Sequence, residues 1–246
     1  MSVHLIGGGA TTSADAALHA PFVAEAAARA SAAGRARPRI AVISLHPESE
    51  EKAAALGELL TAAGRGDGID GIEVHATAGR PGEPVALTAI ADVDGIAVGG
   101  GHVEDVRAGL KPLFDELRRQ VADGVPYLGV SAGAMVAAEG SLGSGSRIGG
   151  VQVAPEDPDD EDEPLELEIE SGIGLVDVAI EVHVAQRGML SRLVAAVESG
   201  LIAGGLGIDE RTALIVGDGR LGSAGKGSVW RVLPTEGGVL VSTIGI

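Results

Sequence analysis

The chain has 246 residues, enough for one large domain, and 45% of them are hydrophobic, which excludes a wholly disordered protein. The formal net charge is −17, so the chain lacks a basic footprint for nucleic acid, and an anionic membrane surface would repel it. Cysteine is absent, which excludes disulfides, thiolate metal sites and a cysteine nucleophile.

Short apolar runs alternate with helix-like stretches over the first 140 residues or so. Strands are predicted at residues 3–6, 39–44, 71–75, 95–98 and 125–130, and helices at residues 50–63, 103–121 and 132–138. This alternation predicts an α/β fold with a mostly parallel sheet flanked by helices. In such a sheet the ligand crevice lies at the carboxyl ends of the strands.

The C-terminal third has a different pattern, with short strands predicted at residues 213–216, 228–232 and 239–243 between glycine-rich turns. We expect these strands to form an antiparallel extension of the same sheet. Neither an internal repeat nor a linker divides the sequence, so we predict a single α/β domain over residues 1–246.

Acidic residues are concentrated in one segment. Ten of the fifteen residues from 156 to 170 are Asp or Glu, and without those ten the formal charge of −17 falls to −7. We interpret residues 155–170 as an acidic insertion that forms a solvated loop. The alternative is that the insertion borders the active site, where it would attract cationic substrates and disfavour anionic ones.

Residues 129–133, Gly-Val-Ser-Ala-Gly, fit the G-x-S-x-G pattern of a nucleophile elbow, directly after a predicted strand and before a predicted helix. The glycines permit a tight turn that exposes the Ser131 hydroxyl, and the N–H of Ala132 then points at a developing oxyanion. The alternative interpretation of so short a pattern is a tight turn with a serine cap.

Two triple-glycine turns also follow predicted strands. In the turn at residues 99–101, Gly100 or Gly101 can supply a second oxyanion donor, because glycine lets the backbone approach a reacting carbonyl closely; an ordinary glycine-rich connection is the alternative. The turn at residues 7–9 lacks the further glycine and the lysine of the common phosphate-binding loops, so a nucleotide site is not favoured.

A catalytic serine needs a base, and His183 is the favoured one of the six histidines because it ends an apolar strand. His102, directly after a triple glycine, is a candidate pocket residue. His19 and His46 are expected on exposed segments. An acid must in turn orient the base, and two adjacent candidates, Asp209 and Glu210, follow another short apolar run.

These motifs, in this order and spacing, resemble the cyanophycinases and the related aspartyl dipeptidases (the dipeptidase E branch) of the serine peptidases, with more likeness to the cyanophycinase side. The resemblance covers most of the chain. It is carried by I-G-G-G near the start, G-V-S-A-G-A at 129–134, H-V-A-Q-R-G-M-L-S-R-L at 183–193 and G-L-G-I-D-E-R-T-A at 205–213. It implies a flavodoxin-like fold similar to the class I glutamine amidotransferases, with serine in place of the usual cysteine.

The resemblance also implies a catalytic triad. Ser131 would attack the scissile carbonyl, His183 would pass its proton to the leaving amine, and Glu210 would orient His183, with Asp209 as the alternative acid. The implied oxyanion donors are the N–H groups of Ala132 and of Gly100 or Gly101.

Departures from the family pattern concern the substrate. Met189 replaces an arginine, and Val103, beside His102, replaces a glutamine. Arg187 and Arg192 remain as candidates to bind a substrate carboxylate, with a structural ion pair as the alternative. His102 is a third candidate substrate contact. Because several of the residues expected to bind the aspartyl-arginine unit of cyanophycin are missing, we do not expect that polymer to be the substrate.

We therefore predict a serine peptidase that cleaves small peptides at aspartyl or isoaspartyl bonds through an acyl-enzyme, without a metal or organic cofactor. An amidase or esterase acting on a non-peptide substrate, and a non-catalytic binding or sensor protein, are the alternatives. The sequence shows no signal peptide and no apolar stretch long enough to span a bilayer, so we expect a cytoplasmic protein. A homodimer is expected by analogy with the family.

Overall fold

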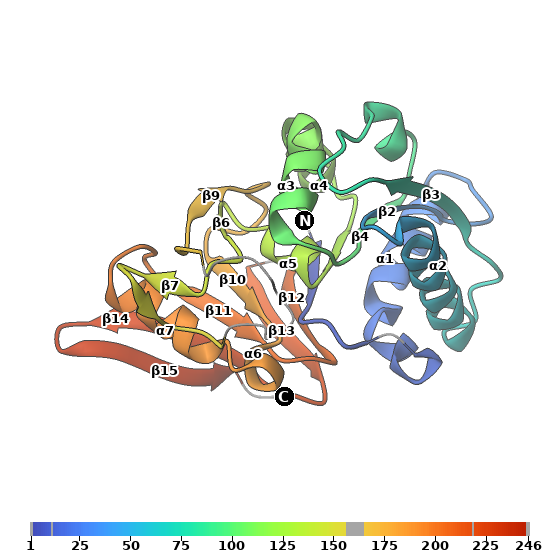
Figure 1. Ribbon diagram of the computed structural model, residues 1–246. Helices are drawn as coiled ribbons and strands as arrows, with labels where there is room; N and C mark the ends of the chain where they lie inside the picture. The colour runs from blue at the N-terminus through green and yellow to red at the C-terminus, as the bar shows by residue number, and fades with distance from the viewer. Residues whose placement is uncertain (1, 11, 156–164, 218, 245–246) are drawn as a thin grey trace.

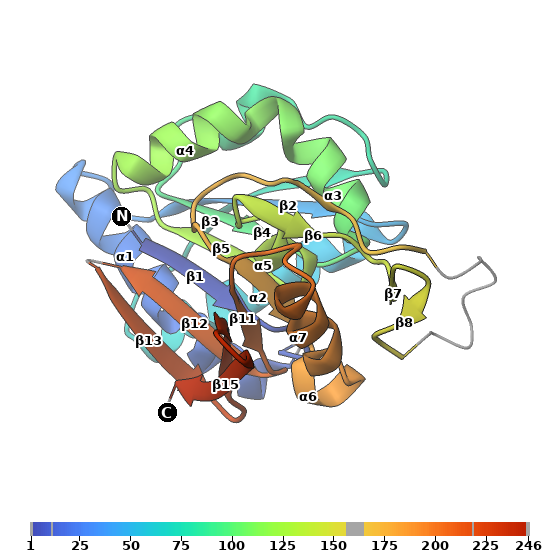
Figure 2. The ribbon, with the colours of Figure 1, turned by 90° about the vertical axis from the view of Figure 1, so that its left-hand side faces the viewer.

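The computed structural model describes residues 2–10, 12–155, 165–217 and 219–244. A seven-stranded sheet in the order β13-β12-β1-β5-β4-β2-β3 forms its centre (Figures 1 and 2). The strands are β1 (Ser2–Ile6), β2 (Arg39–Leu45), β3 (Glu73–Gly79), β4 (Gly95–Val98), β5 (Tyr127–Val130), β12 (Thr212–Gly217) and β13 (Arg220–Gly225). The strands from β1 to β5 pair in parallel, whereas β12 and β13 are antiparallel to their neighbours.

Helices cover both faces of this sheet. The helices α1 (Ala20–Ala32) and α2 (Ser49–Gly66) pack on one face, and α3 (Val103–Leu110), α4 (Phe114–Ala122) and α5 (Ala132–Met135) pack on the other. Strand β2 serves both layers, since Ile40 and Val42 contact the first group while Ala41 and Ile43 contact the second. The short 3₁₀ helices are η1 (Ser13–Leu18), η2 (Leu87–Ile90) and η3 (Lys111–Leu113). The predicted α/β fold class is confirmed.

A second sheet contains β10 (Ala179–Val182), β11 (Gly205–Ile208), β14 (Val229–Thr235) and β15 (Gly238–Ile244). It carries α6 (Val184–Arg187) and α7 (Leu190–Glu198), and β14 and β15 extend away from the central sheet in Figure 1. Two small ribbons pair β6 (Gly140–Leu142) with β9 (Ile169–Ser171) and β7 (Arg147–Ile148) with β8 (Val151–Gln152).

The C-terminal strands are antiparallel as predicted, but they do not all extend the same sheet. Only β12, with its partner β13, joins the central sheet, whereas β14 pairs with β11. The reason lies in the turn before β14, where the Asp209 carboxylate accepts a hydrogen bond from Ser228 N–H at 2.8 Å and so directs the chain onto β11.

Two predicted helices are also altered. The stretch at 103–121 is two α-helices joined by η3, because Pro112 has no N–H to continue the hydrogen-bond ladder. The helix expected from Ala132 to Ala138 ends after four residues at Met135. Among the described residues, no helix is long and apolar enough to cross a membrane.

Candidate active site

A pocket of about 580 Å³ lies where β1, β4 and β5 end, at the edge of the sheet that the sequence predicts for the ligand crevice. Ser131, His183 and Glu210 line it, together with both triple-glycine turns. Segments that are far apart in sequence therefore meet at one point.

The elbow around Ser131 is built from close backbone contacts. Ser131 follows β5 directly and has φ 53° and ψ −116°, an uncommon conformation for a residue with a side chain. A Cβ on Gly129 would lie 2.3 Å from the Gly133 carbonyl oxygen, and one on Gly133 would lie 2.4 Å from the Val98 oxygen. Both positions therefore leave no room for a side chain, in addition to the need for glycine that the tight turn imposes.

Tyr127 holds the turn around Ser131 in place through a buried hydrogen bond. Its side chain is fully buried, and its hydroxyl donates a hydrogen bond of 2.8 Å to the carbonyl of Gly133. Burial raises the pKa of Tyr127 well above its ordinary value, so the hydroxyl remains a donor throughout the physiological range.

The three triad residues form one hydrogen-bonded chain. Ser131 Oγ lies 2.8 Å from His183 Nε2, and His183 Nδ1 lies 2.7 Å from Glu210 Oε1. Because a carboxylate only accepts, Nδ1 carries the proton that binds Glu210, which leaves Nε2 free to accept the serine proton. This arrangement is that of a nucleophile, a general base and an orienting acid.

His183 is mostly buried and is held in a left-handed conformation at the start of α6, with φ 52°. Burial lowers the pKa of His183 below its ordinary value, and the positive charge of Arg187 lowers it further, while the hydrogen bond to Glu210 opposes both effects. The net result is a neutral imidazole at pH 7, the form that a general base requires.

The glycine turn at residues 7–9 packs directly against His183 and Glu210. A Cβ on Gly8 would lie 2.1 Å from His183 Cε1, and one on Gly9 would lie 2.5 Å from a Glu210 carboxylate oxygen. The Gly7 carbonyl accepts a hydrogen bond from His183 N–H at 3.1 Å. The sequence gives no signal for this role beyond the glycines themselves, because the partners are more than 170 residues away.

Asp209, the alternative acid, is directed elsewhere. It accepts hydrogen bonds from Ala185 N–H at 3.0 Å and from Trp230 Nε1 at 2.9 Å. Glu210 is the acid that contacts His183, and the Gln186 side chain accepts a hydrogen bond from Glu210 N–H at 2.8 Å. Asp209 therefore positions the turn, and Glu210 faces the imidazole.

The predicted oxyanion donors lie beside the nucleophile. A Cβ on Gly100 would be 3.2 Å from Ser131 Cβ, so the backbone passes very close to the serine. Within the described part of the chain, the N–H groups of Gly100 and Gly101 have no protein acceptor. Ala132 is the first residue of α5, where a helix leaves its N–H groups free.

The three predicted substrate contacts separate into two groups. His102 and Arg187 are exposed and line the pocket, and Arg187 has no ion-pair partner among the described residues. Arg192 is 2% exposed and does not line the pocket. The prediction that it contacts the substrate is wrong, and the alternative of an ion pair describes it, because its guanidinium binds Glu181 at 2.7 and 2.9 Å.

Sequence reasoning missed a further wall of the pocket. Its lining residues are Ala10, His19, His46, Lys52, Ala55, Leu56 and Leu59. The expectation that His19 lies on an exposed segment is wrong, since its side chain is fully buried between η1 and α1. Amphipathic spacing in α2 does not distinguish a helix face that packs on a sheet from one that also borders a crevice.

The acidic segment is described only in part, because residues 156–164 lie outside the described residues. Of its described acids, Glu166 accepts hydrogen bonds from the N–H groups of Gly149 and Gly150, and Glu170 pairs with Arg107. None of these described acids lines the pocket. Nor, in the described part of the chain, do three or more His, Asp or Glu residues gather as a metal site would need.

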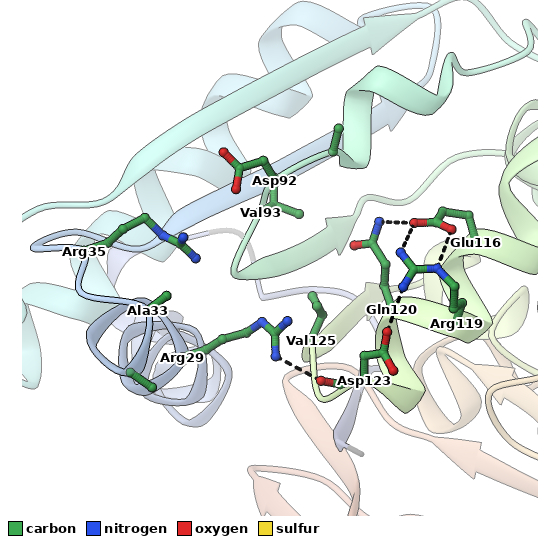
Figure 3. A pocket seen from close by; sticks show the side chains of 12 residues that line it. Arg29, Ala33, Arg35, Asp92, Val93, Glu116, Arg119, Gln120, Asp123 and Val125 are labelled. Atoms are coloured by element: carbon green, nitrogen blue, oxygen red, sulfur yellow. Dashed lines mark hydrogen bonds and ion pairs between the residues drawn. The ribbon is translucent and has the colours of Figure 1, made fainter.

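A second polar pocket, of about 650 Å³, lies at the opposite end of the strands, near the residues that precede β4 and β5 (Figure 3). Its arginines are already engaged: Arg29 donates to the Asp123 carbonyl, Arg119 pairs with Glu116, and Arg35 pairs with a buried Asp94. Its described lining residues include no serine, threonine or histidine, so the pocket around Ser131 is the candidate active site.

Comparisons with known proteins identify the family. Residues 68–223 match the family model described as peptidase family S51. The cyanophycinase of Synechococcus elongatus is 32% identical over 203 residues, which are 80% of this chain and 60% of that protein. The cyanophycinase of Trichormus variabilis is 33% identical over 128 residues, which are 51% of this chain and 39% of that protein. This chain therefore spans 60% or less of the length of these relatives.

Solved structures also match. The crystal structure of a peptidase from an acI-B1 Actinobacterium has a TM-score of 0.66 and 18% sequence identity, and the match covers 100% of this chain and 95% of that one. At this identity the match shows a shared fold.

Proposed function

Because the chain belongs to peptidase family S51, we propose that it is a serine-type peptidase that hydrolyses small peptides at aspartyl or isoaspartyl bonds. The observation that carries the proposal is the continuous hydrogen-bonded chain from Ser131 through His183 to Glu210, beside free backbone donors. The names of the cyanophycinase relatives support hydrolysis of a peptide-like bond.

The proposed reaction has two stages, acylation of Ser131 and hydrolysis of the acyl-enzyme. Ser131 Oγ attacks the scissile carbonyl carbon while His183 Nε2 takes the serine proton, and the N–H groups of Gly100 and Ala132 stabilise the oxyanion. The C–N bond then breaks as His183 gives its proton to the leaving amine, which leaves an acyl ester on Ser131. Water attacks that ester, His183 accepts the proton from water, and the serine regains it when the ester bond breaks.

The proposal is tested by labelling the protein with a fluorophosphonate and by assaying α- and β-aspartyl dipeptides beside simple esters. We expect Ser131 to be labelled and at least one aspartyl dipeptide to be hydrolysed. Both Ser131→Ala and His183→Ala should reduce kcat by roughly 10⁴-fold or more, because the members of a triad act as a unit. Hydrolysis that persists in either variant would overturn the mechanism, and cleavage of the esters alone would overturn the peptide substrate.

A further inference from the structure

The pocket has two walls of different chemistry, one on each side of the nucleophile. His183 and Glu210 lie on the β1 side, since His183 is bound to Gly7 directly after that strand. Helix α2 borders the pocket on the β2 side. In the sheet order β1-β5-β4-β2, strand β5, which Ser131 directly follows, lies between them.

The α2 wall is largely apolar. Ala55, Leu56 and Leu59 come from the helix, and Ala10 lies beside them after β1. Leu56 and Leu59 are each 8% exposed, so they form a floor, whereas Ala55 is exposed. Such a surface gains free energy by covering an aliphatic side chain and offers nothing to a charged one.

His19 does not change this character. Its ring is fully buried, and neither ring nitrogen has a hydrogen-bond partner among the described residues. Burial lowers the pKa of His19, and the nearby Asp15 offsets this only in part. The imidazole is therefore neutral at pH 7 and adds no charge to the wall.

The charged side chains that line the pocket also disfavour a cationic side chain on the substrate. Among the described lining residues, Glu210 is the only acid, and it is engaged with His183 Nδ1 at 2.7 Å. The cationic side chains of Arg187 and Lys52 also line the pocket, although Lys52 is paired with Glu48 at 3.5 Å. A cationic side chain at the α2 wall would meet Lys52 and, among the described lining residues, no carboxylate that is free of a partner.

We propose that the α2 wall, defined by Ala10, Ala55, Leu56 and Leu59, is a specificity subsite for an uncharged aliphatic residue, and that the pocket discriminates against a cationic residue there. The inference rests on the proposed function. The free carboxylate of an aspartyl acyl residue complements Arg187, and we therefore assign the leaving residue of a dipeptide to the α2 wall.

The test compares kcat/KM for β-aspartyl-leucine and β-aspartyl-arginine. We expect a preference for leucine of roughly tenfold or more, the usual size of discrimination by an apolar pocket. Ala55→Asp places a carboxylate at the exposed edge of the wall and should reduce the leucine-to-arginine ratio about fivefold, because a nearby unlike charge favours a bound cation.

Ala54→Asp is the matched control, since Ala54 is the adjacent exposed alanine of α2 and does not line the pocket. It carries the same helix-propensity penalty and the same charge, so its ratio should equal that of the wild type. Ala55→Leu is a second variant that narrows the subsite without adding charge, and it should lower kcat/KM for the leucine substrate more than Ala54→Leu does.

A binding measurement separates this inference from the proposed function. Free L-leucine and L-arginine are compared as competitors that slow fluorophosphonate labelling of Ser131, which needs no peptide hydrolysis. Protection by leucine at lower concentration than arginine supports the subsite even where no dipeptide is cleaved. An equal or greater effect of arginine in both assays overturns it, even where hydrolysis itself is established.

Discussion

At the residue scale, the proposed nucleophile and the proposed base are both held in uncommon backbone conformations. Ser131 and His183 have φ values of 53° and 52°, in the region that favours glycine. Such conformations persist where the surroundings impose them, and here the surroundings are close backbone contacts from Gly8, Gly129 and Gly133. The glycines around the site therefore position the reacting side chains.

We predict that Gly8→Ala inactivates the protein while leaving it folded. The new methyl group would overlap the His183 ring, and a displacement of about 1 Å at a catalytic group costs on the order of 10²-fold in rate. The measurement is the rate of fluorophosphonate labelling, with circular dichroism to check folding.

Gly34→Ala is the control for this prediction. Gly34 has φ +74°, close to the +97° of Gly8, but a Cβ there would meet nothing within 4 Å. Both variants carry backbone strain, and only Gly8→Ala should lose reactivity. Equal labelling rates for the two would show that the contact with His183 has no role.

A second prediction at this scale concerns the pH below which the labelling rate falls, the acid limb of the pH–rate profile. Because the pKa of His183 is lowered in the folded protein, the neutral base persists as the pH falls below 6.5 and is lost only at lower pH. Arg187→Gln removes one of the charges that lower this pKa, so the acid limb of the labelling rate should move to higher pH. The control is Arg65→Gln, which removes an equal charge from α2 outside the pocket and should leave the position of the acid limb unchanged. An unshifted limb in Arg187→Gln would contradict the assigned cause.

At the element scale, the buried pair of Arg192 and Glu181 joins parts of the fold that border the site. Glu181 lies in β10, two residues before His183, and Arg192 lies in α7. The Arg192 guanidinium also donates to the carbonyls of Gly143 and Gly145, at 3.0 and 3.2 Å. One side chain thus ties a strand, a helix and a loop together.

Removing one partner of this pair should be costly. We predict that Arg192→Met lowers the free energy of unfolding by about 3–5 kcal/mol, because it leaves the Glu181 charge buried without a partner. The double variant Glu181→Leu/Arg192→Met should recover part of the loss. Urea denaturation followed by Trp230 fluorescence gives both values. A raised KM with unchanged stability would instead restore the substrate-binding role.

At the scale of the whole molecule, the charge of −17 and the cationic pocket lining act in opposite directions on an anionic substrate. Distant negative charges repel the substrate across solvent and are strongly screened by salt, whereas a direct contact with Arg187 is screened less. The net effect of added salt on association is therefore expected to be favourable.

We predict that kcat/KM for an anionic aspartyl dipeptide rises about two- to fivefold between low salt and physiological ionic strength, where the Debye length falls to about 8 Å. The C-terminal amide of the same dipeptide carries less negative charge and should respond less. A fall in kcat/KM with salt for the anionic substrate would mean that local attraction by the pocket dominates the global repulsion.

The sequence by itself determined what is encoded over short distances. The alternation of buried strands and helices predicted the α/β fold, and the elbow at Ser131 was visible because G-x-S-x-G needs only five neighbouring residues. The motifs around His183 and Glu210 carried a resemblance to the cyanophycinases, and it was this resemblance that implied a meeting with Ser131.

The tertiary structure alone decided the relations between distant segments. It placed Arg192 in a buried ion pair and brought α2 to the pocket as an apolar wall. It also moved β14 to a second sheet. The physical reason is the same in each case, since burial and hydrogen-bond partners depend on which segments pack together, and residue spacing within one segment does not contain that information.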